Sequence, residues 1–195
     1  MNSPDDERQA LYTHFEENVK KHFGFLSNMF RSVDKKTIGW IVRYTSYKVE
    51  VNIYYERLSF EIFLTLNLKN PRISLYLEEI ITGSEKRRYR CAVDAAIIEK
   101  SVIEMADLLK KYGRSFLAGD AELYNEIKKS RDTREQEFAL KNKIMKVEER
   151  AKTAWENGNY EEVVTLYQSI KEKLTPIQEK RLSISKKRIA ELSNL

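Results

Sequence analysis

The residues that could take part in chemistry are few and widely spaced. His14 and His22 lie eight positions apart, whereas two histidines that share a metal ion on one helix usually lie four apart, and no third ligand accompanies them. Cys91 is the only cysteine, so the chain can form no internal disulfide, and no histidine is placed to activate its thiol. We interpret the histidines as surface or boundary residues and the cysteine as an ordinary thiol.

Neither a pair of carboxylates nor a common catalytic motif indicates an enzyme. Glu50 and Glu61 could lie near each other on the polar face of a predicted sheet, but two acids alone do not make a glycosidase. The sequence contains no GxGxxG, GxxxxGK[ST], HExxH or GxSxG motif. We therefore predict a protein that is not an enzyme and that uses no cofactor and no metal.

The side chains better suited to binding a partner come from residues 47–67. Apolar residues alternate there with polar ones in two runs, which predicts two half-buried antiparallel strands. Either a neighbouring element covers part of the polar face, or that face is an exposed recognition surface. A basic loop at residues 84–90 could also bind a phosphate or an acidic protein. The candidate partner-binding residues are Lys48, Glu50, Asn52, Tyr54, Glu61 and Phe63 on the polar face, and Arg87, Arg88 and Tyr89 in the loop.

The pairing of these two strands depends on the connection between them. If Glu56-Arg57 is a two-residue loop, Tyr55 faces Leu58 and Ile53 faces Phe60, and every apolar position lands on one face. Glu-Arg is a poor pair for a tight hairpin turn, which favours Gly or Asn, so a longer loop is the alternative.

The elements around this hairpin complete an α+β domain. We expect an N-terminal helix at residues 5–29, a first strand at 40–45, and a long helix at 94–117 that packs across a three- or four-stranded antiparallel sheet. Residues 75–82 are predicted as a short helix, with a fourth strand as the alternative. A further short helix is expected at 122–130, followed by a boundary or a solvated helical continuation.

The remaining chain is predicted to be a helical extension. Apolar residues recur at helical spacing after Phe138 in three segments, which end near Asn157-Gly158, at Thr175-Pro176 and at Leu192. We therefore predict an α+β domain at residues 1–131 and a helical extension at 132–195. In the extension we expect four residues to be buried: Val147, Ala151, Trp155 and Tyr167.

The composition sets limits on location and partners. The chain has 195 residues and a net charge of +5, with 35 Lys and Arg against 30 Asp and Glu, so its charges are mostly intermixed. The single cysteine suits a reducing compartment, the polar and acidic N-terminus is unlike a signal peptide, and no apolar run approaches a membrane span. We predict a cytoplasmic protein that does not bind a membrane.

The extension resembles one tetratricopeptide repeat at about residues 144–177. Ala151, the turn at 158–160, Tyr167 and Pro176 fall at or near the positions where that repeat has its small, turn, aromatic and closing residues. A single repeat cannot bury its own apolar face. This resemblance implies a helical hairpin that docks either on the same chain or on a second copy in a homodimer.

Residues 44–120 resemble small bacterial immunity-type proteins of toxin systems. The resemblance rests on four short segments: Tyr54-Tyr55-Glu56-Arg57, Ser59-Phe60-Glu61, the six residues from Leu108 to Gly113, and the four from Leu117 to Asp120. It implies a non-enzymatic protein-binding module, an antitoxin that neutralises a toxin by direct binding. The alternative function is nucleic-acid binding or regulation through the basic loop at 84–90 and the basic C-terminal helix.

Overall fold

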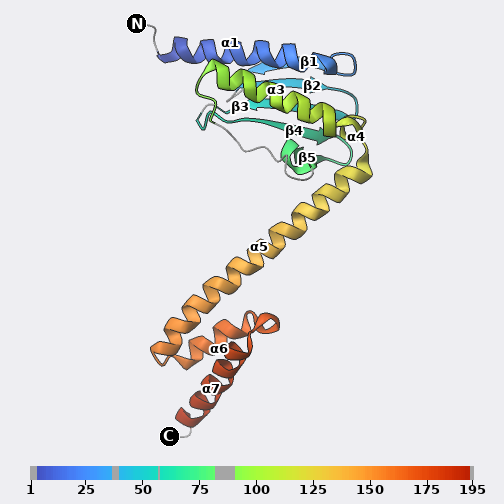
Figure 1. Cartoon of the computed structure of the whole chain (residues 1–195). Coiled ribbons are helices and arrows are strands. Elements are labelled where there is room, and N and C mark those ends of the chain that lie inside the picture. The colour runs from blue at the N-terminus through green and yellow to red at the C-terminus, as the bar shows by residue number, and fades with distance from the viewer. Residues whose placement is uncertain (1–3, 37–39, 57, 82–90, 194–195) are drawn as a thin grey trace. The chain divides into compact units, whose positions relative to one another are not determined.

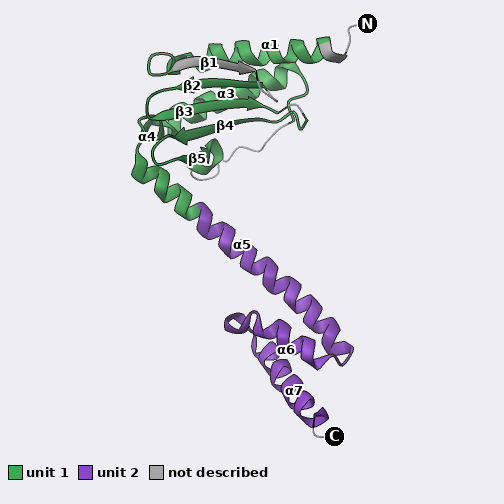
Figure 2. Ribbon diagram, turned by 180° about the vertical axis from the view of Figure 1, so that it is seen from behind, with its two compact units in different colours: residues 1–130 green, residues 131–195 purple. Residues whose placement is uncertain are grey.

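The computed structural model describes residues 4–36, 40–56, 58–81 and 91–193 of the chain. The chain divides into two compact units, residues 1–130 and 131–195, and this division lies one residue from the predicted boundary (Figure 2). The first unit combines helices with an antiparallel sheet and the second is helical, so the predicted α+β class is confirmed.

The sheet is an antiparallel meander with the strand order β1-β2-β3-β4-β5 (Figure 1). It contains one strand more than the largest number predicted, because β1 occupies a segment that we expected to be a polar connection. This strand pairs with β2 along its whole length, and edge strands are often rich in charged residues, so no apolar period marks them. The strands are β1 (Arg31–Lys36), β2 (Trp40–Thr45), β3 (Val49–Tyr55), β4 (Ile62–Leu68) and β5 (Ile73–Tyr76).

The connection between β3 and β4 is longer than two residues, so the register predicted for a tight turn is wrong. Tyr55 pairs with Ile62 and Ile53 with Leu64, a shift of four residues from the predicted partners. Because four is an even number, the same apolar set still faces the core. The apolar residues left in the loop are Leu58, which is 88% exposed, and Phe60, which has a positive φ of 56°.

Two helices cover one face of the sheet. α1 (Pro4–His22) ends earlier than predicted and is followed by a 3-10 turn, η1 (Gly24–Leu26). α3 (Ala95–Tyr112) begins after Asp94, whose side chain accepts a hydrogen bond from the backbone N–H of Ile97 at 2.8 Å. The two helices lie on the same side of the strands (Figure 1). Together with the inward side chains of the strands, they form one apolar core.

The short helices that precede and follow α3 in the chain differ from the predictions. The segment predicted as a helix at 75–82 is a strand up to Tyr76 and a helix only over α2 (Leu77–Ile80). The backbone N–H of Tyr76 donates to Oε2 of Glu79 at 2.7 Å, which satisfies a donor at the helix start. The predicted helix at 94–117 is divided at Gly113, and α4 (Arg114–Leu117) follows.

One long helix, α5 (Ala121–Glu156), replaces the short helix predicted at 122–130. It begins in the first unit, where Tyr124 is buried in the core, and it continues through residues 133–141, all of which are exposed. The solvated helical continuation is therefore the alternative that the structure supports. The segment is rich in Arg, Glu, Gln and Lys, which favour helix without tertiary contacts.

The second unit is the predicted helical hairpin followed by one more helix. α5 turns at Gly158, which has a φ of +71°, into α6 (Tyr160–Gln168), and a 3-10 turn, η3 (Lys171–Lys173), leads to α7 (Pro176–Leu192). Side-chain caps at Asn159 and Thr175 start α6 and α7.

The core of this unit confirms three of the four predicted buried residues. Val147, Ala151 and Tyr167 are buried together with Ala154, Val163 and Ile170. Trp155 is only half-buried, because its ring packs edge-on against Tyr160 at a centroid distance of 5.6 Å and keeps part of its surface in solvent. The expectation of a fully buried Trp155 is therefore wrong.

Candidate functional site

The candidate site is the face of the sheet opposite α1 and α3, which we call the open face. Within the described part of the first unit, both helices lie on the other side of the strands (Figures 1 and 2). Strand alternation sends every second side chain of β2 to β5 to this face. The register arranges these side chains in three rows across the strands: Ile41, Tyr54 and Phe63; Arg43, Asn52, Thr65 and Tyr76; Thr45, Glu50, Asn67 and Ser74.

An aromatic cluster occupies one side of the open face. Tyr54 and Phe63 are cross-strand partners, and their rings stack with centroids 4.6 Å apart and an interplanar angle of 12°. Phe63 also contacts Tyr76 on β5, at 6.0 Å and 55°. The Tyr76 side chain is 46% exposed. Rings that pack on one another in this way hold each other in place and present a rigid apolar surface at a small cost in side-chain entropy.

A hydrogen-bond network occupies the centre of the open face. Arg43 Nε donates to Asn52 Oδ1 at 3.0 Å and lies 3.4 Å from Glu50 Oε1. Asn52 Nδ2 donates to Glu50 Oε1 at 2.9 Å and reaches the Tyr54 hydroxyl at 3.3 Å. The network therefore joins a cation, an anion, an amide and the aromatic cluster in one fixed arrangement.

A second group of hydrogen bonds extends this network toward β4. Asn67 Nδ2 donates to Thr65 Oγ1 at 3.0 Å and to the backbone oxygen of Glu50 at 3.3 Å. Asn52 and Thr65 are buried although they lie on the open face. Side chains held by several partners change little on binding, so the face is pre-organised for a partner.

The two oppositely charged side chains of the network are paired with each other. The Arg43 and Glu50 side chains lie within ion-pair distance and are each about a quarter exposed. Below them, the Tyr55 hydroxyl donates to the Ala92 carbonyl at 2.7 Å on the core side of the sheet. Burial, with a smaller contribution from Cys91, raises the pKa of Tyr55 to about 12, so this phenol stays neutral at physiological pH.

The structure brings together four of the predicted partner-binding residues and places Lys48 and Glu61 outside the three rows. Glu50, Asn52, Tyr54 and Phe63 lie together on the open face. Lys48 lies in the turn between β2 and β3, where its stem packs against Gly119.

Glu61 lies beyond the paired part of β4, bridged to Cys91. It is six residues from Asn67, the partner of Glu50, so about 20 Å separates the two acids. The expected proximity of Glu50 and Glu61 is therefore wrong, because it depended on the shorter loop. The predicted residues Arg87, Arg88 and Tyr89 lie outside the described residues.

Sequence reasoning missed four members of the site: Arg43, Thr65, Asn67 and Tyr76. Arg43 and Thr65 occupy alternate positions of strands that were predicted, so the same alternation could have placed both on the polar face. Tyr76 was assigned to a helix, and its contact with Phe63 depends on the pairing of β4 with β5. The cluster thus needed the fourth strand that was only an alternative.

The other residues considered for chemistry have ordinary surroundings. His14 Nε2 lies 3.1 Å from the Ala95 carbonyl and 3.1 Å from Asn18 Nδ2, which ties α1 to the start of α3. Cys91 Sγ lies 3.4 Å from the Ser59 carbonyl. No group of three or more His, Cys, Asp or Glu side chains suited to a metal occurs among the residues that the structure describes.

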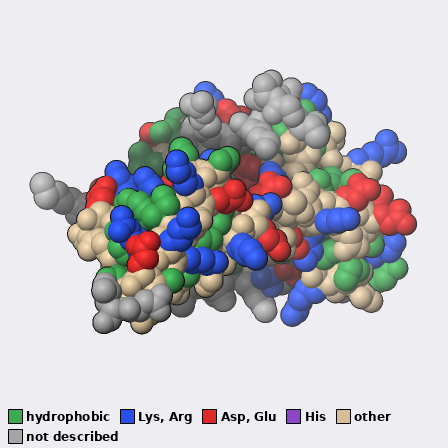
Figure 3. Space-filling view, turned by 90° about the horizontal axis from the view of Figure 1, so that it is seen from below, with side chains coloured by type: hydrophobic (Ala, Val, Ile, Leu, Met, Phe, Trp, Pro, Cys, Tyr) green, Lys and Arg blue, Asp and Glu red, His purple; other side chains and the backbone are tan. Residues whose placement is uncertain are grey.

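The charge of the surface and the hydropathy of the helices are the last features of the described residues that bear on a partner. Basic and acidic side chains alternate over much of the face seen in Figure 3, with hydrophobic side chains between them. Over the described ranges, no helix combines the length and the apolar character needed to cross a lipid bilayer.

Comparison with protein-family models, with curated proteins and with solved structures finds no match for the chain. The resemblances to immunity-type proteins and to a tetratricopeptide repeat therefore stay predictions.

Proposed function

We propose that the protein is a non-enzymatic binding module that engages another protein through the open face of its sheet. The observation that carries this proposal is the aromatic cluster of Tyr54, Phe63 and Tyr76 beside a hydrogen-bonded polar network. Both lie on the face of the sheet that faces away from α1 and α3, the two long helices described in the first unit. Protein interfaces often combine an aromatic centre with a polar surround of satisfied hydrogen bonds.

The charge of the open face supports a protein partner over a nucleic acid. Surfaces that stack nucleic-acid bases usually add unpaired cations for the phosphates. Here the positive charge of Arg43 is matched by Glu50 at 3.4 Å. The finer proposal is that the partner is a bacterial toxin, which the protein neutralises in the cytoplasm, in line with the resemblance of residues 44–120.

The test is co-purification with the product of the adjacent gene, combined with rescue of cells that express that product. Tyr54→Ala removes one ring of the stack and should weaken the complex about 30-fold or more, as expected for an interface hot spot. Tyr47→Ala is the matched control, because Tyr47 is also an exposed tyrosine, 85% accessible, but lies in the turn between β2 and β3. It should bind as the unchanged protein does.

Thermal melts distinguish lost binding from lost folding, since Tyr54 is half-buried against Phe63. A complex that is equally tight with Tyr54→Ala and with Phe63→Ala would contradict the open face as the binding surface. Absence of both a complex and rescue would contradict the toxin as the partner.

A second candidate function is nucleic-acid binding, which the basic residues of α7 favour. Lys180, Lys186, Lys187 and Arg188 are exposed on this helix, and Arg188 lies 3.6 Å from Glu191. Phosphate binding would show a steep loss of affinity with salt, measured by filter binding at two salt concentrations. No binding at low salt would eliminate this function.

A further inference from the structure

One face of α5 in the second unit is apolar at two positions that stay exposed among the described residues of the unit. Phe138 is 66% exposed and Met145 is 61% exposed. They are seven residues apart, so they lie two helical turns apart on almost the same line of the helix surface. Large apolar side chains exposed on a regular line of a helix mark a surface that binds another helix.

This line lies opposite the packed side of α5. Val147 and Ala151 carry the contact with α6 and α7, and Val147 lies about half a turn around the helix from Met145. Arg150 and Glu162, 3.2 Å apart, and Lys143, which donates to the Ser169 carbonyl at 3.2 Å, mark the flanks toward α6. The core of the second unit therefore does not use the line of Phe138 and Met145.

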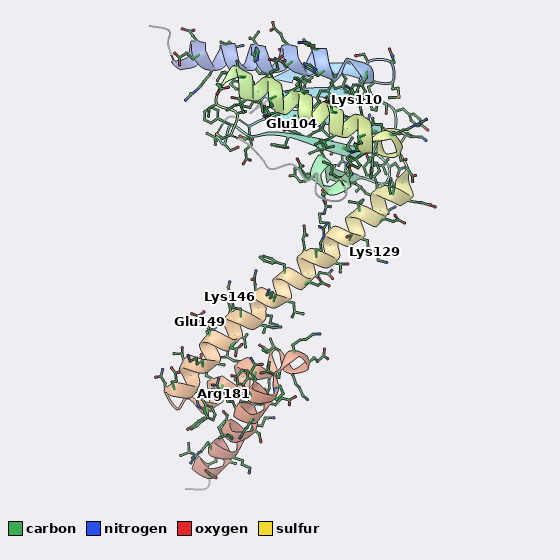
Figure 4. All side chains as sticks on the ribbon, viewed as in Figure 1. Glu104, Lys110, Lys129, Lys146, Glu149 and Arg181 are labelled. Atoms are coloured by element: carbon green, nitrogen blue, oxygen red, sulfur yellow. The ribbon has the colours of Figure 1, made fainter. Side chains whose placement is uncertain are left out.

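Two charged residues extend this line with a symmetric spacing. Arg134 precedes Phe138 by four residues, and Glu149 follows Met145 by four residues, so the order is cation, apolar, apolar, anion with spacings of 4, 7 and 4. Figure 4 shows Glu149 and Lys146 on a flank of α5 that does not carry α6 and α7. Arg134 and Glu149 are both exposed.

A spacing of this kind is complementary to itself when a second copy runs in the opposite direction. With a two-fold axis between residues 141 and 142, Phe138 of one chain meets Met145 of the other, and Arg134 meets Glu149. Each contact occurs twice, and a Met sulfur beside an aromatic ring is favourable. A parallel, in-register pair would instead place Arg134 against Arg134 and Glu149 against Glu149.

We propose that the protein forms an antiparallel homodimer through this line of α5, from Arg134 to Glu149. The occupant is a second copy of the chain, because the order of charges is complementary to its own reversal. The proposed contact uses no residue of the open face. An experiment that contradicts the dimer therefore leaves the proposed binding of another protein untouched, and the reverse also holds.

The first experiment measures the mass of the full chain in solution by sedimentation equilibrium. The expected result is twice the chain mass of 23.1 kDa at about 100 µM protein. Phe138→Ala should raise the dissociation constant of the dimer on the order of 100-fold, because each dimer loses two copies of the contact. Ile177→Ala is the matched control, since Ile177 is 68% exposed on α7, and it should leave the constant unchanged.

A charge-reversal cycle tests the direction of the helices. Arg134→Glu and Glu149→Arg should each weaken the dimer several-fold, because each places like charges together, and the double variant should restore much of the affinity. The two residues lie about 22 Å apart within one chain, so they cannot compensate each other there. A double variant as weak as the product of the single effects would overturn the proposed pairing.

Disulfide trapping gives an independent readout in a Cys91→Ser background. Lys141→Cys lies next to the two-fold axis and should cross-link the dimer on oxidation, whereas Arg134→Cys should not, because about 22 Å separates its two copies in the antiparallel pair. Cross-linking at both positions would indicate a parallel pair. A monomer at all concentrations without cross-linking at either position would overturn the dimer itself.

Discussion

Removing a single oxygen atom from Tyr167 should make the second unit more stable. The Tyr167 side chain is fully buried in the core of α5, α6 and α7. Its hydroxyl is one of three buried side-chain polar atoms for which no hydrogen-bond partner occurs among the described residues. Folding thus transfers this hydroxyl out of water without replacing its hydrogen bonds.

The size of the effect follows from the cost of such a transfer. A buried hydroxyl without a partner costs about 1–3 kcal/mol. Tyr167→Phe keeps the ring that packs beside Ala151 and Val163 and removes only the oxygen. We expect the free energy of unfolding of this unit to rise by about 1–2 kcal/mol, since the small gap left by the oxygen offsets part of the gain.

Tyr55→Phe is the control with the opposite sign. The Tyr55 hydroxyl is also buried, but it donates to the Ala92 carbonyl at 2.7 Å. Its removal leaves that carbonyl, on the fully buried Ala92, without this donor. The first unit should lose about 1–2 kcal/mol, the range expected for a broken buried hydrogen bond.

The two tryptophans allow each unit to be followed separately in urea. Trp40 contacts Tyr12 and Tyr55 in the first unit, and Trp155 contacts Tyr160 in the second. In a Trp40→Phe background, the fluorescence of Trp155 reports the second unit alone. With a urea slope of about 1 kcal/mol/M for a unit of this size, the midpoint should rise by about 1–2 M in Tyr167→Phe.

The result that refutes this reasoning is a midpoint that falls in Tyr167→Phe by as much as in Tyr55→Phe. Such a fall would mean that the Tyr167 hydroxyl has a partner in solution, such as an ordered water molecule. A parallel change in the slope would instead indicate a different unfolded or native state, so the slope is compared first.

Two other outcomes are expected in the first unit. Gly119→Ala should lower the free energy of unfolding of the first unit by about 2 kcal/mol or more, because φ is +75° and the new Cβ would lie 3.0 Å from the Lys48 stem. Gly158→Ala is the comparison in the second unit: φ is +71° but the space is open, so backbone strain should cost only about 1 kcal/mol. The urea midpoints of the two variants test this difference. Alkaline pH should also destabilise the first unit, because the pKa of Tyr55 is about 12 in the folded state and 10.0 in the unfolded state. As the pH rises, the unfolded chain loses this proton first, so the stability of the unit falls from about pH 10 to about pH 12. Burial also raises the pKa of Tyr124 in the same unit, so Tyr55→Phe should reduce this dependence without abolishing it in urea titrations at several pH values. An unchanged slope would show that Tyr55 does not contribute.

The sequence by itself determined which side of each strand faces the core. The alternation from Val49 to Tyr55 and from Ile62 to Leu68 sets the faces whatever the register, because side chains alternate with a period of two. In the structure Asp94, Asn159 and Thr175 cap the starts of three helices, and a capping side chain acts within its own turn. These are local properties, and they were sufficient for the fold class and for placing Glu50, Asn52, Tyr54 and Phe63 on one face.

Only the tertiary structure decided which of these side chains meet. The loop between β3 and β4 shifts the register by four residues, which separates Glu50 from Glu61 and places Glu50 opposite Asn67. Arg43 and Tyr76 join the site through β2 and β5, two strands that flank the hairpin. Pairing between strands is set by the closure of loops and by packing against helices, which depend on residues far apart in the sequence, and no local pattern encodes that choice.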